Sequence, residues 1–193
     1  MKEIRWGILG VSGHYRLRVQ IPVRHIPGMR VVGIASRDSA RADAAAVEFG
    51  IEKPYGNYDD LVADESIDAV YIPLPNHLHL EWIRKCADAG KHILCEKPLT
   101  LNAADAQDAI DYAAEKGVLL MEAFMYRYHP QWIRARELIA VGEIGTVTAI
   151  QTHFCYNNTD PNNIRNRADA GGGGILDIGC YAVSSARFLM DCE

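Results

Sequence analysis

Two short segments of the chain carry side chains suited to proton transfer. Lys97 stands in the run Cys-Glu-Lys-Pro, where an ammonium group can polarise a substrate oxygen or lower the pKa of a neighbouring acid. Asp177 and Tyr181 follow a run of four glycines and lie four residues apart in a helical pattern, so they share one face. An unperturbed tyrosine has a pKa of about 10 and is a poor base at neutral pH. A nearby Lys97 would lower that pKa, while Asp177 would orient a substrate hydroxyl or the lysine.

Each of these residues also has a purely structural interpretation. Lys97 fits a surface lysine, and Asp177 fits a carboxylate that the helix dipole stabilises. Tyr181 fits a core tyrosine whose hydroxyl has found a partner. The segment around Asp177 and Tyr181 leaves both interpretations open.

A glycine-containing turn follows the first expected strand. Gly10, Ser12, Gly13 and His14 stand where strand and helix would meet, so that backbone N–H groups and the helix N-terminus can approach a pyrophosphate. In the usual Gly-x-Gly-x-x-Gly spacing, Ser12 occupies the second glycine position and Tyr15 the third. The alternative is a plain tight turn, and the β-α-β context favours the dinucleotide site.

The end of the second strand indicates which dinucleotide would bind. An NAD site would place an Asp or Glu there for the ribose hydroxyls. This chain has Ser36 and Arg37, with Arg41 one helical turn later. A hydroxyl and two guanidinium groups suit a 2′-phosphate, so we predict NADP rather than NAD. The alternative is that both arginines are solvated surface charges.

A proline-containing loop follows the third strand. Leu74, Pro75 and Asn76 are expected to line the nicotinamide side of a bound cofactor. His77 suits an ordinary surface position at a helix start. His79 either faces the cofactor or has a structural role, and the sequence does not separate these two.

The elements that position these residues alternate between short apolar runs and helical patterns, as parallel β-α-β units do. We therefore predict an α/β fold, with a doubly wound Rossmann sheet over residues 1–125 and the start of an α+β substrate domain over 126–193. In the second part we expect helices at 130–140 and 175–189 and a long strand at 146–156. The strands of the first part are expected at 4–9, 30–35, 69–72, 92–95 and 118–122, and its helices at 15–26, 39–49, 78–89 and 103–116.

Composition excludes several function classes. The 193 residues carry a net charge of −5, and this lack of basic excess argues against nucleic-acid binding. No apolar run is long enough to span a bilayer, so we expect a cytoplasmic protein without membrane association. The five cysteines are widely spaced without a CxxC motif, which predicts reduced thiols and no metal site.

Taken together, the motifs resemble the Gfo/Idh/MocA family, the glucose–fructose oxidoreductase and inositol dehydrogenase group. They occur in that family's order and spacing along the whole chain. The run from Met121 through His129 and the run from Asp160 through Arg165 also resemble the sugar-oxidising branch. The motifs are Gly10-Val11-Ser12-Gly13, Ser36-Arg37, Pro75-Asn76-x-x-His79, Glu96-Lys97-Pro98 and the segment from Gly171 to Tyr181.

The resemblance implies a mechanism and a set of site residues. A sugar or cyclic-diol carbon exchanges a hydride with NADP, Tyr181 exchanges the proton, Lys97 supplies positive charge, and Asp177 positions the lysine or the substrate. Inositol-type relatives have His at the position of Tyr181, so the tyrosine favours the NADP-dependent aldose (xylose-type) and dihydrodiol branch. Expected substrate contacts are His129, Asn162 and Arg165, against purely structural loop roles. Expected cofactor contacts are Gly10, Ser12, Gly13, His14, Ser36, Arg37, Arg41, Leu74, Pro75, Asn76, His79, Glu96 and Lys97.

Members of this family carry a second domain built on a large open sheet, which is expected to begin at Thr146–Tyr156. The chain ends soon after the segment bearing Tyr181, so most of that sheet is expected to be missing. A completed sheet would offer a homo-oligomer interface, and a lone strand would be prone to pairing or aggregation. Two alternatives to an enzyme are therefore a nucleotide-binding module without turnover and an assembly subunit. The particular sugar or diol is not predictable from these residues.

Overall fold

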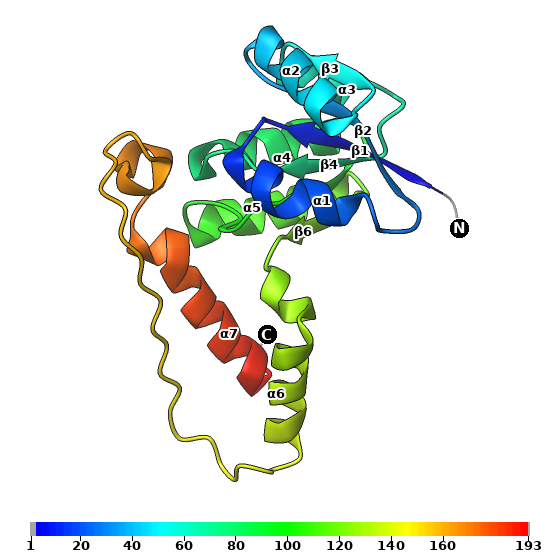
Figure 1. Ribbon diagram of the computed structural model, residues 1–193. Coiled ribbons are helices and arrows are strands. Elements are labelled where there is room, and N and C mark those ends of the chain that lie inside the picture. Colours follow the sequence, from blue (N-terminus) through cyan, green and yellow to red (C-terminus); the bar gives the residue numbers. More distant parts are fainter. Residues whose placement is uncertain (1–2, 193) are drawn as a thin grey trace. The chain divides into compact units, whose positions relative to one another are not determined.

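A computed structural model of the chain describes residues 3–192. The described chain forms two compact units, which divide between Glu122 and Ala123 (Figure 1). The first unit contains a six-stranded sheet in the order β3-β2-β1-β4-β5-β6, and every neighbouring pair is parallel. This confirms the predicted α/β Rossmann fold. The strands are β1 (Ile4–Leu9), β2 (Met29–Ala35), β3 (Lys53–Tyr55), β4 (Ala69–Ile72), β5 (His92–Cys95) and β6 (Leu120–Glu122).

Both faces of this sheet are buried, as in other doubly wound folds. On one face Leu9 and Ile72 pack with residues of the helices α3 (Tyr58–Ala63), α4 (His79–Asp88) and α5 (Ala103–Glu115). On the other face Ile8, Ile34 and Tyr71 pack with residues of the π-helical turn (Tyr15–Val19) and of α2 (Ser39–Phe49). Alternate residues of each strand thus reach different cores. The helical elements are a π-helical turn (Tyr15–Val19), α1 (Gln20–Val23), α2 (Ser39–Phe49), α3 (Tyr58–Ala63), α4 (His79–Asp88) and α5 (Ala103–Glu115).

Local signals account for most of these boundaries. The side chains of Asp38, Asn57 and Asn102 accept hydrogen bonds from backbone N–H groups in the first turns of α2, α3 and α5. Gly50 ends α2 in the left-handed conformation, with φ of 65°. The expected strands of the first unit are confirmed, with ends shifted by at most two residues. Two short elements, β3 (Lys53–Tyr55) and α3 (Tyr58–Ala63), are not among the predicted ones.

The helix expected over residues 15–26 is shortened at Pro22, the residue expected to kink or shorten it. A π-helical turn, in which the N–H of Gln20 donates to the carbonyl of Tyr15, precedes the four residues of α1. Pro22 has no N–H to donate, and its ring opposes an α-helical carbonyl four residues earlier. The proline therefore shortens the regular helix.

The second unit contains α6 (Pro130–Ala140), a π-helical turn (Ile175–Gly179) and α7 (Cys180–Met190). The helices α6 and α7 lie side by side (Figure 1), linked by an ion pair between Arg136 and Asp191. The core of this unit is small and aromatic. It consists of Phe124, Tyr126 and Phe188, with Trp132, Cys180, Tyr181 and Leu189 packed against them.

The strand expected at Thr146–Tyr156 is not formed, and that prediction was wrong. The segment, yellow in Figure 1, has no regular secondary structure. A β-strand requires a partner for its N–H and C=O groups. Among residues 3–192 the six strands that pair all lie in the first unit, so the β-branched and aromatic residues of this segment have no ladder to join.

The five cysteines are free thiols in this structure. Cys86 and Cys95 are fully buried in the core of the first unit, and burial raises the pKa of Cys86 to about 12. Both thiols are therefore inert packing residues.

In the part of the chain that the structure describes, no helix combines the length and the apolar character needed to cross a membrane.

Candidate functional site

The predicted cofactor residues follow four parallel strands. Because β1, β2, β4 and β5 run in the same direction, the loops that follow them meet at one edge of the sheet. The strand that follows β1 in the chain, β2, lies on one side of the pair β1 and β4, and the strand that follows β4, β5, lies on the other side. The strand order therefore reverses between β1 and β4, which makes this edge a topological switch point. Open α/β sheets bind ligands in the crevice at such a point. The structure thus brings together the segments after β1 (Gly10–His14), β2 (Ser36 and Arg37), β4 (Leu74–Asn76) and β5 (Glu96 and Lys97).

The turn after β1 shows why its glycine pattern departs from the usual one. Gly10 has φ of 98°, and a Cβ at this position would lie 3.0 Å from Cδ2 of Leu74. The hydroxyl of Ser12 accepts a hydrogen bond of 3.0 Å from the N–H of Tyr15, so the serine caps the following helical turn. Gly13 is exposed, and no described atom lies within 4 Å of where its Cβ would be. The turn therefore leaves room for a ligand beside Gly13.

His14 and Glu96 connect this turn to the end of β5. The Nε2 atom of His14 lies 3.3 Å from Oε1 of Glu96, and the hydroxyl of Tyr71 donates to the same oxygen at 2.6 Å. Burial raises the pKa of Glu96, but the contacts with His14 and Tyr71 outweigh it, so the pKa lies below its ordinary value. Glu96 is thus an ionised link between two loops of the edge. Tyr71 was not among the predicted site residues.

The residues after β2 have different roles. Ser36 is buried, and its hydroxyl accepts from the N–H of Asp38 at 3.2 Å. One guanidinium nitrogen of Arg41 donates to the carbonyl of Val11 at 2.5 Å, which ties α2 to the glycine turn. Arg37 is exposed and makes no hydrogen bond or ion pair with any described residue. Its guanidinium group remains available to an anion.

His79 is fully buried, which favours the structural role that the sequence left open for it. Its Nδ1 atom lies 2.9 Å from the carbonyl oxygen of Pro98, and its Nε2 atom lies 2.9 Å from that of Leu74. The neighbouring His77 is exposed, as expected. Lys97 is half-buried and precedes a cis peptide bond to Pro98.

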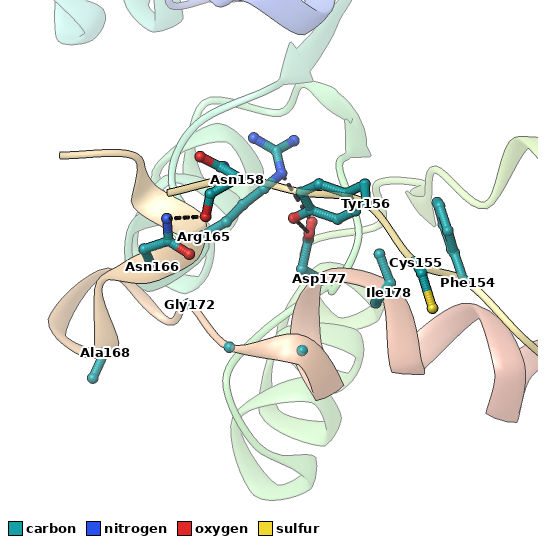
Figure 2. Close-up of a pocket in the computed structure, with 12 residues that line it drawn as sticks. Phe154, Cys155, Tyr156, Asn158, Arg165, Asn166, Ala168, Gly172, Asp177 and Ile178 are labelled. Atoms are coloured by element: carbon teal, nitrogen blue, oxygen red, sulfur yellow. Dashed lines mark hydrogen bonds and ion pairs between the residues drawn. The ribbon is translucent and has the colours of Figure 1, made fainter. Parts of the chain in front are cut away.

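A pocket of about 550 Å³ lies within the second unit, and Asp177 is one of the residues that line it (Figure 2). The Nε atom of Arg165 lies 3.1 Å from one carboxylate oxygen of Asp177, and the hydroxyl of Tyr156 donates to the other. The side chain of Asp177 is only 12% exposed. Aromatic rings beside carboxylate, amide and guanidinium groups can both stack on a sugar and hydrogen-bond to its hydroxyls. The lining residues are Phe154, Cys155, Tyr156, Asn158, Arg165, Asn166, Ala168, Gly172, Gly173, Gly174, Asp177 and Ile178.

Only part of the predicted substrate set lies in this pocket. Of the described residues, Arg165 and Asp177 line it, whereas His129, Asn162 and Tyr181 do not. His129 caps α6 by accepting from the N–H of Gln131, which is the structural alternative considered for it. Asn162 lies in an exposed turn.

The hydroxyl of Tyr181 donates to Sδ of Met125 at 3.4 Å, and its ring packs edge-on against Phe124 and Tyr126. Lys97 belongs to the first unit, and Asp177 and Tyr181 belong to the second.

Several pocket residues were not anticipated. Phe154 and Tyr156 belong to the segment expected to be a strand, where alternate residues share a face. The two-residue spacing of Phe154 and Tyr156 was the feature of the sequence that could have predicted that both side chains lie on one side of the segment. Asn158 and Asn166 lie in a polar loop, and no pattern in the sequence distinguishes them from solvated residues.

Comparison with known proteins agrees with this architecture. The model of an oxidoreductase family with an NAD-binding Rossmann fold, Gfo/Idh/MocA, matches residues 4–124, and the model of that family's C-terminal domain matches residues 132–193. The chain is 48% identical over 186 residues to D-xylose 1-dehydrogenase (NADP(+)) 2 of Haloferax volcanii, covering 96% of this chain and 57% of that protein. It is 35% identical over 192 residues to trans-1,2-dihydrobenzene-1,2-diol dehydrogenase of Xenopus tropicalis, covering 98% and 57%.

A crystal structure of a 3-ketoreductase from Actinomadura kijaniata, in complex with NADP and TDP-benzene, matches with a TM-score of 0.92 and 38% identity. The match covers 98% of this chain and 58% of that one. The chain therefore spans less than two thirds of the length of these relatives. From the switch-point edge, the glycine turn and the family match over residues 4–124, we conclude that this chain belongs to the Gfo/Idh/MocA oxidoreductase family.

Proposed function

We propose that this protein is an oxidoreductase that transfers a hydride between NADP(H) and a carbon bearing a hydroxyl or carbonyl group in a sugar or cyclic diol. The observation that carries the proposal is the carboxyl edge of the sheet, where an open glycine turn follows β1 and an exposed arginine follows the neighbouring strand β2. The similarity to the xylose and dihydrodiol dehydrogenases supports the substrate class.

The cofactor assignment rests on the residues after β2. A carboxylate there would repel a 2′-phosphate, and this chain has Ser36 and Arg37 instead. Arg37 is the guanidinium group available for the phosphate, because Arg41 already donates to the carbonyl of Val11. Arg41 thereby contributes mainly by fixing the turn. The NADP complex of the A. kijaniata ketoreductase and the NADP-dependent xylose dehydrogenase are consistent with this choice.

Bound NADP⁺ would accept the hydride, and NADPH would donate it. We propose that the phenol of Tyr181 exchanges the proton of the reacting hydroxyl and that the ammonium of Lys97 stabilises negative charge on that oxygen. Asp177 accepts hydrogen bonds from Arg165 and Tyr156, and we propose that it also accepts one from a substrate hydroxyl. The pocket around Asp177, with Phe154 as an aromatic wall, is then the place where the sugar ring binds.

The cofactor half of the proposal is tested by titrating the protein with NADPH and with NADH while following nicotinamide fluorescence. We expect NADPH to bind more tightly. Arg37→Ala should weaken NADPH binding ten- to a hundredfold, because a charge-assisted bond contributes about 1.5–3 kcal/mol, and should leave NADH binding unchanged. The matched control is Arg84→Ala, which removes another exposed arginine that pairs with Asp108 on α5. Equal NADPH binding by wild type and Arg37→Ala would contradict the assignment.

The catalytic half is tested by supplying aldoses and cyclic diols with NADP⁺ and following NADPH formation. Turnover on a sugar or diol supports an enzyme. Tight NADPH binding without turnover on any of these substrates would instead support a nucleotide-binding module.

A further inference from the structure

His79 is a fully buried polar side chain that the proposed chemistry does not use. It is the first residue of α4. Both of its ring nitrogens face backbone carbonyl oxygens at 2.9 Å, one belonging to Leu74 and the other to Pro98. Leu74 lies in the loop after β4, and Pro98 directly follows Lys97. The imidazole therefore lies between two of the loops that form the cofactor edge.

Main-chain bonds alone do not extend the sheet into these loops. The ladder between β4 and β5 ends at the pair Ile72 and Cys95, followed by one bond of 3.0 Å from the N–H of Glu96 to the carbonyl of Ile72. Beyond that point both strands end and are followed by loops. A buried imidazole that contacts both carbonyls, and donates to at least one of them, supplies a connection where the ladder has ended.

We propose that His79 is a positioning residue for the cofactor edge, because its imidazole fixes the backbone that bears Lys97 relative to the loop Leu74–Asn76. The inference rests on the proposed function only in treating these loops as cofactor-binding. His79 itself has no accessible surface and therefore acts through the two carbonyls, without touching the cofactor.

The chemistry of the ring sets a minimum requirement at this position. A carbonyl oxygen only accepts, so each contact needs an N–H on the ring; a neutral imidazole has one N–H and a protonated imidazole has two. Burial lowers the pKa of His79, opposed by the contacts with Leu74 and Pro98 and by the negative charge of Glu96. A neutral ring therefore donates to one of the two carbonyls, and a residue without a donor bonds neither.

The geometry allows each contact to be restored separately. An asparagine amide nitrogen lies near the position of histidine Nδ1, which faces Pro98, and a glutamine amide nitrogen lies near that of Nε2, which faces Leu74. The variants are therefore His79→Leu, which has no donor, His79→Asn and His79→Gln. Two controls accompany them. Ile83→Ala opens the same core one helical turn later on α4, and His77→Leu removes the exposed neighbouring histidine.

The first measurement is backbone hydrogen exchange of peptides covering residues 73–78 and 96–101. His79→Leu should accelerate exchange in both peptides. His79→Asn should restore protection mainly in 96–101, and His79→Gln mainly in 73–78. Ile83→Ala should destabilise the unit without this pattern, and His77→Leu should match the wild type. The proposal is overturned if His79→Leu leaves both peptides protected, or if Ile83→Ala reproduces its pattern.

Two further measurements keep the test independent of variant folding and of cofactor binding. In the wild type, ¹⁵N NMR of the histidine rings should show a solvent-protected N–H on His79, and its absence would overturn the proposal. NADPH titration should show about tenfold weaker binding for His79→Leu, with partial recovery in the two amide variants. If the wild type binds no NADPH, the proposed function fails, while the exchange and NMR results still decide the role of His79.

Discussion

The proposed cofactor edge of the first unit and the pocket of the second unit are built in different ways. At the edge, the proposed cofactor residues follow parallel strands, and the buried side chains of Tyr71 and His79 contact the loops from the core. In the pocket, Asp177 is held by Arg165, from an exposed 3₁₀ turn (Ile164–Asn166), and by Tyr156, from an exposed segment without regular secondary structure.

This difference has a physical consequence for robustness. A parallel ladder and fully buried hydrogen bonds are costly to break, because each broken bond leaves an unsatisfied polar group. Exposed ion pairs and hydrogen bonds contribute only about 0–1 kcal/mol, because water competes for the same groups. Substitutions at the edge should therefore affect folding and binding together, whereas substitutions in the second unit should affect chemistry with little change in stability.

The largest expected effect is on turnover. Tyr181→Phe removes the proposed proton-transfer group and should lower the rate of sugar or diol oxidation about 10²- to 10⁴-fold. NADPH affinity and the free energy of unfolding should remain near wild type, because phenylalanine keeps the ring that packs edge-on against Phe124 and Tyr126. Steady-state kinetics with NADP⁺, combined with denaturant unfolding, measures both. A variant that keeps wild-type turnover would show that another group exchanges the proton.

The next effect is on stability at the edge. Gly10→Ala places a Cβ at φ of 98° and 3.0 Å from Leu74, and should cost about 2–3 kcal/mol. The matched control is Gly50→Ala, where φ is 65° and no described atom lies within 4 Å, so only backbone strain of about 1 kcal/mol is expected. Urea unfolding compares the two. Equal losses would mean that the contact with Leu74 relaxes freely and that the turn is less rigid than its bonds imply.

Acid should weaken the first unit through Asp64. Hydrogen bonds from Lys53, Tyr55 and Ser66 hold the pKa of Asp64 well below its usual value. A carboxyl whose pKa is depressed by folding stabilises the protein above its unfolded pKa of about 3.9, and that stabilisation is lost as pH falls further. Unfolding measured between pH 7 and pH 2 should therefore depend less steeply on pH below about pH 4 in Asp64→Asn than in the wild type.

Asp191→Asn is the control for that experiment, because Asp191 is exposed and pairs only with the exposed Arg136 among the described residues. A wild-type pH profile in Asp64→Asn would contradict the assignment of the acid sensitivity to this network.

The smallest effect is expected at the surface of the second unit. Arg136→Ala removes the ion pair with Asp191 and a guanidinium group that lies 5.2 Å from the ring centre of Phe188. Both groups of the pair are substantially exposed, so the loss in unfolding free energy should be about 0–1 kcal/mol. Thermal unfolding at low and high salt measures it. A loss of several kcal/mol would show that the two helices of this unit depend on the pair.

Most of the sheet was predictable because its signals are local. Apolar runs mark the central strands, Asp38 and Asn102 cap their helices, and Gly50 ends α2. The loops that carry Gly10, Arg37 and Lys97 were predictable in turn, since parallel strands place their carboxyl ends at one edge. The strand β3 was not predicted because it has only three residues, one of them a proline.

The second unit was less predictable for the opposite reason. The composition of Thr146–Tyr156 favours a strand, but β propensity describes how side chains fit beside neighbouring strands, and this segment has none in the described chain. Local pattern therefore indicated a conformation that requires a distant partner. Helices α6 and α7 were predictable, since their hydrogen bonds are internal to each segment.

The chain's own pattern was thus sufficient for the layers, the strand directions and the loops where a dinucleotide would bind, because these depend on neighbouring residues. The role of each polar side chain within those loops was not in the pattern. His79 and Arg37 both precede or begin helices at the same edge, yet one is fully buried between two carbonyls and the other lies in solvent. That distinction depends on which distant backbone groups surround each side chain, and those groups come together only when the sheet has assembled.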